Sequence, residues 1–291
     1  MFQGSMVALV TPMQRDGSID KKAFLNLIEW HIAAKTKAIV VVGTTGEAST
    51  LSEAEQYDLI SSAVKQAAKR VPIIAGTGTH STQHTVTLTK NAKKAGADAA
   101  LIVTPYYNKP TQAGLFQHYQ MIAEQALFPI ILYNVPGRTA CDLLPDTVER
   151  LSRLQQIVGI KEATGKLDRA LDIIARCNKS FDVYSGDDAT ALGLMQHGAK
   201  GVISVTANVS PGKMHALCEA ALSGNHGLAN QIQAELMPLH QALFLESNPI
   251  PVKWALAELG LIPPGIRLPL SPLDAKYHDE LKAAMRKVGV V

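Results

Sequence analysis

Short apolar runs recur along the chain, and each is followed by a stretch in which apolar residues have helical spacing. Eight of these runs have the length of strands and lie at residues 5–10, 38–43, 72–77, 99–104, 129–134, 157–161, 181–186 and 201–206. The stretches between them, such as DKKAFLNLIEWHIAAK and SEAEQYDLISSAVKQAAKR, are long enough for helices of three turns or more. The pattern therefore predicts a repeated strand–helix unit.

Three of the helix-to-strand joints have similar sequences, namely AAKTKAIVVVG, KKAGADAALIV and QHGAKGVISV. In each, small residues or glycine end the helix and a strand begins shortly afterwards, as a helix C-cap requires. Strands that alternate with helices and are apolar on both faces predict a buried parallel sheet. Eight such units suit an α/β fold of the (βα)₈ TIM-barrel type, which typically takes ~250 residues. An open doubly wound sheet remains the alternative, because spacing does not establish closure.

After about residue 225 the pattern contains helices only. Apolar residues with helical spacing occur at 228–244, 252–260 and 274–288, and the stiff sequence NPIP precedes the second of these stretches. We therefore expect a catalytic barrel over residues 1–224 and a small all-helical domain over residues 225–291.

Composition limits the classes of function. With 47% hydrophobic and 18% charged residues the chain can fill a large core, so disorder is excluded. The formal net charge is +3 and the basic residues are spread along the sequence, which argues against nucleic acid as a partner. The first apolar run, residues 6–10, is too short for a signal peptide or a membrane span, so we expect no membrane partner and a cytoplasmic location. Three scattered cysteines in no CxxC pair predict no disulfide framework.

Polar residues gather directly after the predicted strands. These segments are TP at 11, GTTGEAST at 43, GTGTH at 76, TPYYNKP at 104, YNVPGRT at 133, KEATG at 161, SGDDAT at 185 and TANVSP at 206. In a TIM barrel the active site lies at the carboxyl ends of the strands, so these segments would surround one pocket.

Several candidates in these segments have simpler explanations. His80 and His84 lie four residues apart, but no HExxH motif or third ligand accompanies them, so we expect no metal. The glycines of GTGTH form neither GxGxxG nor a Walker motif, so we expect no nucleotide cofactor. Asp187 and Asp188 are adjacent and would diverge, and capping of a helix explains them at least as well as catalysis.

Lys161 ends the apolar run IVGIK, which is an unusual place for a lysine. Most lysines at strand ends are simply solvated. A protonated lysine is no nucleophile, and at a reference pKa near 10.4 only ~0.04% is free amine at pH 7. Burial at the barrel end would lower the pKa, and the free amine could then attack a ketone to form an imine.

Other side chains at strand ends complement such an amine. A phenol beside a threonine hydroxyl can give and take protons, and Tyr133 with Thr44 is the natural pair, with Tyr106 or Tyr107 nearby. Arg138 offers a planar fork for a carboxylate. The hydroxyls and backbone amides of the GTTG turn would suit a second carboxylate. A 2-oxo acid is therefore the expected substrate.

Five segments in register resemble the dihydrodipicolinate synthase family, a part of the pyruvate-dependent class I aldolase and N-acetylneuraminate lyase superfamily. They are GTTGE at 43–47, TPYYNKP at 104–110, YNVPGRT at 133–139, GIKEATG at 159–165 and NPIPVKWA at 248–255. The similarity extends from SMVALVTP to RLPLSP and so covers nearly the whole chain. It implies a TIM barrel with a C-terminal helical domain, in a homotetramer built as a dimer of dimers.

The resemblance also implies a reaction and roles for residues. The reaction is condensation of pyruvate with L-aspartate 4-semialdehyde, the first committed step toward diaminopimelate and lysine. Lys161 would form the Schiff base, and Tyr133, Thr44 and Tyr107 would form a proton relay, with Tyr107 reaching into the site of the neighbouring subunit. The resemblance further implies substrate contacts from Thr45 to the pyruvate carboxylate, from Arg138 to the semialdehyde carboxylate, and from Gly186 and Ile203 in the pocket wall.

One departure concerns regulation. In feedback-inhibited members lysine binds at positions that here are Ala48, Ser49, Glu53, Gln56, His80, His84 and Tyr106. His84 stands where those enzymes carry a carboxylate for the ammonium group of lysine, and His80 replaces an amide. Because an imidazole cannot balance an ammonium as a carboxylate does, we expect weak or absent inhibition by lysine.

Two alternatives stay open. Lyases for sialic acid or for 2-keto-3-deoxy sugar acids share the lysine chemistry, although the sialic-acid lyases lack an arginine at the position of Arg138. A catalytically silent barrel with a binding or regulatory role is the other alternative, since fold alone does not establish activity.

Overall fold

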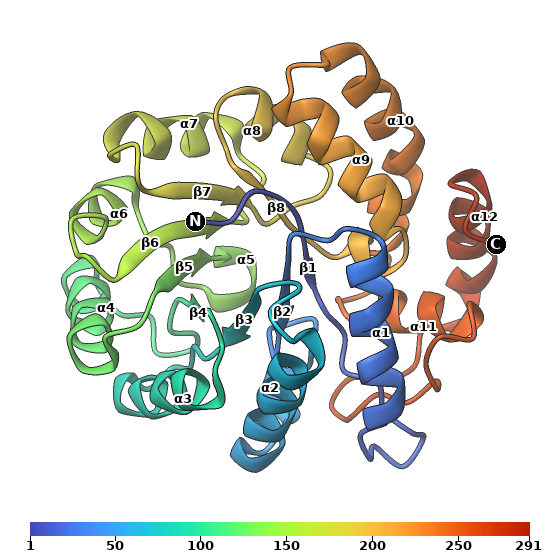
Figure 1. The fold of residues 1–291 in the computed structure, drawn as a ribbon, viewed down its shortest axis with the longest axis horizontal. Helices are drawn as coiled ribbons and strands as arrows, with labels where there is room; N and C mark the ends of the chain where they lie inside the picture. Colours follow the sequence, from blue (N-terminus) through green and yellow to red (C-terminus); the bar gives the residue numbers. More distant parts are fainter.

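The computed structural model describes all residues, 1–291, and its centre is a closed barrel of eight parallel strands in chain order (Figure 1). Strand β1 pairs with both β2 and β8, which closes the sheet and excludes the open doubly wound alternative. The strands are β1 Gly4–Ala8, β2 Ala38–Val41, β3 Ile73–Gly76, β4 Ala99–Val103, β5 Ile130–Asn134, β6 Ile157–Glu162, β7 Asp182–Ser185 and β8 Gly201–Ser204. All eight predicted strands are confirmed, most of them shorter than predicted.

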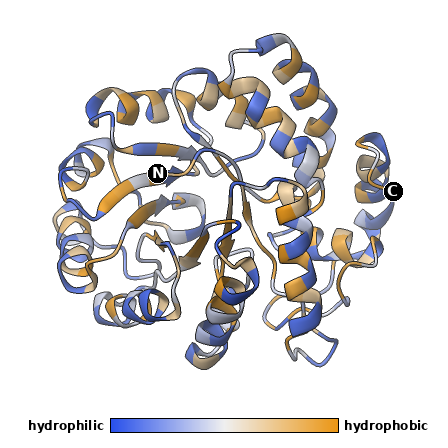
Figure 2. Ribbon diagram, in the orientation of Figure 1, coloured by the Kyte–Doolittle hydropathy of each residue, from blue (hydrophilic) through white to orange (hydrophobic).

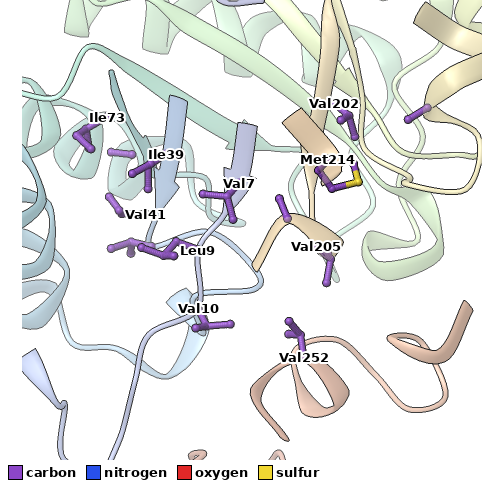
Figure 3. Packing of buried hydrophobic residues seen from close by; sticks show 14 of the residues in the cluster. Val7, Leu9, Val10, Ile39, Val41, Ile73, Val202, Val205, Met214 and Val252 are labelled. Carbon is purple, nitrogen blue, oxygen red and sulfur yellow. The ribbon is translucent and has the colours of Figure 1, made fainter. Parts of the chain in front are cut away.

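Alternate residues along the strands face the two sides of the barrel wall. Met6 and Ala8 of β1 belong to a cluster of buried residues that also contains Leu101 of β4 and Ile131 of β5, on the far side of the barrel, so this cluster fills the barrel interior. Val7, between them, belongs to the larger core between strands and helices. Figure 3 shows part of this outer core, with Val7 on β1, Leu9 directly after β1, and Ile39 and Val41 on β2. Both faces of the sheet are therefore buried, as the continuous apolar runs predict.

Helices surround the barrel (Figure 1) and carry bands of both hydrophobic and hydrophilic residues (Figure 2). Polar caps fix several helix starts: Asp20 accepts from the backbone of α1, and Ser52 forms a capping box with Glu55 at α2. The helices up to residue 222 are α1 Lys21–Ala33, α2 Glu53–Ala67, α3 Thr82–Ala95, α4 Gln112–Ala126, α5 Pro136–Thr139, α6 Pro145–Leu151, α7 Leu167–Arg176, α8 Ala191–Gln196 and α9 Pro211–Leu222, with 3-10 turns at Ala48–Thr50 and Thr206–Asn208.

The C-terminal part consists of helices only, as predicted. These are α10 His226–Ala242, α11 Ile250–Glu258, a 3-10 turn at Ala275–Tyr277 and α12 His278–Lys287. Helix α10 packs against α9, and α12 lies against α10 at the edge of the molecule (Figure 1). Residues of α10, α11 and α12, including Leu236, Leu256 and Leu281, join the same buried cluster as the outer face of the barrel. The division into domains at residue 224 stays a prediction.

Buried polar contacts fasten this C-terminal part to the loop after β2. Lys253 of α11 donates to Glu47, and both side chains are almost inaccessible to solvent. Arg267, in the loop before α12, donates from its backbone to Glu47 and from its guanidinium to Glu55. The segment that carries Thr44 and Thr45 is thus held from outside by the C-terminal helices.

None of the helices combines the length and the apolar character that crossing a membrane requires.

Candidate active site

A cavity of about 380 Å³ opens at the carboxyl ends of the strands β2 to β5. Much of its wall comes from the segments that follow these strands, where the sequence analysis predicts the active-site residues. The lining includes Thr44, Tyr133 and Arg138 from the predicted catalytic set, and Ala48, Ser49, Gln56, His80, His84 and Tyr106 from the predicted effector positions.

Lys161 and Tyr133 are neighbours across two strands. Tyr133 on β5 is directly opposite Lys161 on β6 in the parallel register. The Lys161 Nζ lies 4.4 Å from the centroid of the Tyr133 ring, and the two side chains are only 5% and 7% exposed. The sequence predicted that Lys161 and Tyr133 lie close together, and the register of β5 and β6 places them side by side.

Burial changes the titration of Lys161. Desolvation lowers its pKa to about 8, and the positive charge of Arg138 acts in the same direction, while the negative charge of Asp188 opposes both. A pKa near 8 gives roughly 9% free amine at pH 7, about 200 times the fraction of an ordinary lysine. The predicted direction of the shift is confirmed, so Lys161 is able to act as a nucleophile near neutral pH.

Tyr133 is held in its protonated form. Burial raises the pKa of its phenol, and the charge of Arg138 and the hydroxyl of Thr44 moderate this effect. Both of these groups line the same cavity as the tyrosine. A protonated phenol beside a hydroxyl is able to donate a proton to a developing oxyanion and then to regain a proton through the hydroxyl.

Gly186 lies against the stem of Lys161. A Cβ at this position would come within 2.9 Å of the Lys161 Cε and 2.5 Å of the Ala163 Cβ, so only glycine leaves the lysine its place. The backbone N–H of Gly186 donates to the carbonyl of Glu162 at 2.8 Å, which fixes the close approach. Ile203 on β8 is fully buried inside the barrel.

Thr45 is buried in the loop after β2 and lies outside the cavity wall. Its hydroxyl accepts a hydrogen bond from the Asn248 Nδ2 at 2.9 Å. The backbone N–H groups of residues 44–46 donate no hydrogen bond within the chain. Consecutive free amides of this kind suit an anion, as the GTTG sequence suggested.

The two tyrosines after β4 differ in exposure. Tyr106 lines the cavity, and its ring contacts the imidazole of His80 edge-on at a centroid distance of 5.3 Å. Tyr107 is 90% exposed and its backbone has the left-handed φ of 75°. Within one chain Tyr107 is therefore not brought to Tyr133, and the single chain does not complete the predicted relay.

Most of the altered effector positions belong to the wall of the cavity. Six of the seven line it, and the Oε1 of the seventh, Glu53, lies 3.1 Å from the Nε2 of His84. The His84 side chain is 40% exposed. One continuous space within the chain therefore connects Tyr133 with the two histidines.

The structure corrects the expectation for one residue of the acidic pair. Asp187 accepts from the backbone and hydroxyl of Thr190 and so closes the turn that leads into α8. Asp188 instead accepts from the backbone N–H groups of Val205 and Thr206 after β8, at 3.0 and 2.9 Å, and raises the pKa of Lys161. The prediction that Asp188 caps a helix was wrong, because its hydrogen-bond partners are 17 and 18 residues away in sequence.

Comparisons with known proteins identify the family of the chain. The model of the dihydrodipicolinate synthetase family matches residues 1–288. The chain belongs to this family. Two relatives named 4-hydroxy-tetrahydrodipicolinate synthase, from Ectopseudomonas mendocina (strain ymp) and Pseudomonas aeruginosa, are each 58% identical over the full length of both chains. The crystal structure of the chloride-inhibited dihydrodipicolinate synthase from Acinetobacter baumannii, complexed with pyruvate, is 54% identical, covers both chains completely and has a TM-score of 0.99.

Family membership makes this chain an enzyme of the lyase class, which argues against the alternative of a catalytically silent barrel. The TIM barrel is shared with the family's solved structures.

Proposed function

We propose that the enzyme condenses pyruvate with L-aspartate 4-semialdehyde to give 4-hydroxy-tetrahydrodipicolinate, through an imine on Lys161. The observation that carries the proposal is a buried lysine with a pKa of about 8, placed 4.4 Å from the ring of Tyr133 at the carboxyl end of the barrel. The names of the relatives support the reaction, and the pyruvate complex of the Acinetobacter baumannii enzyme supports the first substrate.

The reaction begins with attack of the free Lys161 amine on the keto carbon of pyruvate and loss of water. The resulting imine withdraws electrons, so a proton leaves the methyl carbon and an enamine forms. The enamine carbon attacks the aldehyde of the semialdehyde, whose oxygen takes up a proton. The amino group of the second substrate then attacks the imine carbon, which closes the ring and releases the Lys161 amine.

Tyr133, Thr44 and Tyr107 would move these protons. The raised pKa of Tyr133 keeps its phenol protonated until an oxyanion or carbinolamine requires the proton. Thr44 lies beside it in the cavity wall and can pass the proton on. The third member has to come from a second chain, because Tyr107 is exposed in its own chain.

The two carboxylates of the substrates would bind at separate groups. Thr45 and the free amides of residues 44–46 suit the pyruvate carboxylate. Arg138 lines the cavity next to Tyr133 and would bind the semialdehyde carboxylate with its planar fork. Gly186 and Ile203 would shape the pocket around the imine.

A substrate panel tests the reaction against the related lyases. Purified enzyme with pyruvate and L-aspartate 4-semialdehyde should form product, while sialic acid and 2-keto-3-deoxy sugar acids should not be cleaved. Replacement of Arg138 by Lys should raise the KM for the semialdehyde about tenfold or more, because a bidentate contact is lost. Cleavage of a sugar acid at a rate that exceeds the condensation would contradict the assignment.

The assembly is also part of the proposal. An exposed tyrosine in a left-handed backbone conformation is easier to understand if a second chain covers it. We propose a homodimer as the smallest complete unit, with Tyr107 shared across the dimer, in a homotetramer built as a dimer of dimers.

We also propose that lysine inhibits the enzyme weakly or not at all. His84, which lies beside Glu53, and His80, which contacts Tyr106, line the cavity at the positions where the ammonium group of lysine would require a free carboxylate. Half-maximal inhibition by lysine below about 1 mM, which corresponds to ~4 kcal/mol of binding free energy, would contradict this proposal.

A further inference from the structure

Asn248 makes a single side-chain hydrogen bond, and this bond is to Thr45. The residue precedes α11 and is 5% exposed. Its Nδ2 donates to the Thr45 Oγ1 at 2.9 Å, whereas its Oδ1 is buried and has no partner in the protein. Burial of an amide with one half unbonded costs free energy, so stability alone is a poor explanation for an asparagine here.

The bond determines where the Thr45 proton can point. A threonine hydroxyl has one hydrogen to donate and two lone pairs that accept. Because the amide of Asn248 occupies a lone pair, the O–H of Thr45 is directed elsewhere, and it donates to no group of the protein. The reverse orientation of the amide would capture this proton and leave both of its N–H groups unbonded, whereas the present orientation leaves one N–H group and the carbonyl without a partner.

Asn248 also contacts Arg138 through its backbone. The Arg138 Nη2 donates to the Asn248 carbonyl oxygen at 3.1 Å. This bond uses one of the five guanidinium N–H groups and leaves the others free for a carboxylate. One residue thus touches both groups that the proposed function assigns to the two substrate carboxylates.

We propose that Asn248 is a positioning residue for pyruvate. Its amide directs the free O–H of Thr45 toward the substrate carboxylate, beside the free backbone amides of residues 44–46. Its carbonyl steadies Arg138 independently of the side chain. The inference rests on the proposed function and adds a residue that is outside the predicted set.

The test uses the full-length enzyme and measures two quantities. The pyruvate concentration at half-saturation is obtained from the yield of borohydride-trapped adduct on Lys161 over a range of pyruvate concentrations. The KM for the semialdehyde comes from steady-state rates. In Asn248→Ala we expect the pyruvate concentration at half-saturation to rise about tenfold, because one oriented hydrogen bond to the substrate is lost. The semialdehyde KM should change less than about threefold, because the backbone carbonyl remains for Arg138.

Asn248→Asp is the second variant and is nearly isosteric. Its carboxylate can only accept, so the Thr45 proton would turn away from pyruvate and half-saturation should rise further than in Asn248→Ala. If half-saturating pyruvate in Asn248→Asp equals that of the wild type, the amide has the reverse orientation and the proposal is wrong.

A double-mutant cycle separates positioning from general stability. On a Thr45→Val background, Asn248→Ala should add less than about twofold to half-saturating pyruvate, because no hydroxyl is left to direct. Arg267→Ala is the control, since it loosens the same loop and leaves Thr45 untouched; it should lower the melting temperature without a selective effect on pyruvate. Additive effects in the cycle, or equal effects of Asn248→Ala and Arg267→Ala on half-saturation, would overturn the inference. A wild type that forms no adduct would overturn the proposed function itself.

Discussion

At the scale of single residues, the chemistry depends on the environment that the barrel gives to Lys161. Its position after IVGI could be read from the sequence, and so could its neighbours Tyr133 and Arg138. The opposing charge of Asp188 could not, because this carboxylate reaches the site from a different strand end through bonds to Val205 and Thr206. Only the closed barrel brings these segments together.

The pH dependence of the reaction should report this balance of charges. Only the free amine of Lys161 reacts, so kcat/KM for pyruvate should rise with pH and level off above a midpoint near 8. The negative charge of Asp188 favours the ammonium form; Asp188→Asn should therefore lower the pKa of Lys161 and move the midpoint to lower pH. Asp187→Asn, which changes the adjacent turn residue, is the control and should leave the midpoint in place. A midpoint that moves upward in Asp188→Asn would refute the assignment.

Gly186 provides a second test at this scale. A methyl group in Gly186→Ala would approach the Lys161 Cε to 2.9 Å and displace the lysine from its productive position. Because small misplacements of a nucleophile are costly, we expect kcat to fall about 100-fold while the protein stays folded. Gly193→Ala is the matched control, since its Cβ would meet no atom within 4 Å in α8. Similar activities of the two variants would argue against a role of Gly186 in placing the lysine.

At the scale of elements, the sequence predicted all eight strands and the helical C-terminal part, because apolar periodicity reflects burial directly. It did not predict how the C-terminal helices fasten the loop after β2. The pair Glu47 and Lys253 is separated by 206 residues, and Asn248 lies 203 residues from Thr45. No local pattern encodes such contacts; the pattern of NPIPVK by itself predicts a stiff joint followed by a helix, and its resemblance to the family gave no contact with Thr45.

The buried pair should be costly to break. Lys253→Met leaves the carboxylate of Glu47 buried without its cation, and we expect a loss of about 3–5 kcal/mol in the free energy of unfolding. Urea denaturation measures this loss, and the double variant Glu47→Gln with Lys253→Met should recover much of it. Lys213→Met, which removes one partner of an exposed pair with Glu235, is the control and should unfold like the wild type. Equal stability of Lys253→Met and Lys213→Met would show that the buried pair does not fasten the loop.

At the scale of the whole molecule, the site of one chain is incomplete. Lys161, Tyr133 and Thr44 come together within the chain, but Tyr107 is 90% exposed. The sequence pattern could place Tyr107 after β4, whereas its use by a neighbouring chain was implied only by the resemblance. Periodicity describes burial within a chain and carries little information about surfaces between chains.

Complementation between inactive variants tests the shared site. Tyr107→Phe and Lys161→Ala should each have little activity as pure proteins. In hybrid dimers one site would combine the intact lysine of one chain with the intact tyrosine of the other. Random reassortment of an equal mixture should therefore restore up to about 25% of wild-type activity, because half of the dimers are hybrids with one complete site. Measurement after mild denaturation and refolding of the mixture gives the result, with each variant refolded alone as control. Activity that stays at the level of the separate variants would place Tyr107 outside the partner's site.

The central claim is that Lys161 forms an imine with pyruvate, and one measurement tests it most directly. The enzyme is incubated with pyruvate and borohydride, digested, and mapped by mass spectrometry. The account predicts one reduced pyruvyl group per chain, on Lys161, and none in Lys161→Ala or in wild type without pyruvate. A wild-type enzyme that remains unmodified, or that carries the group on another lysine, would contradict it.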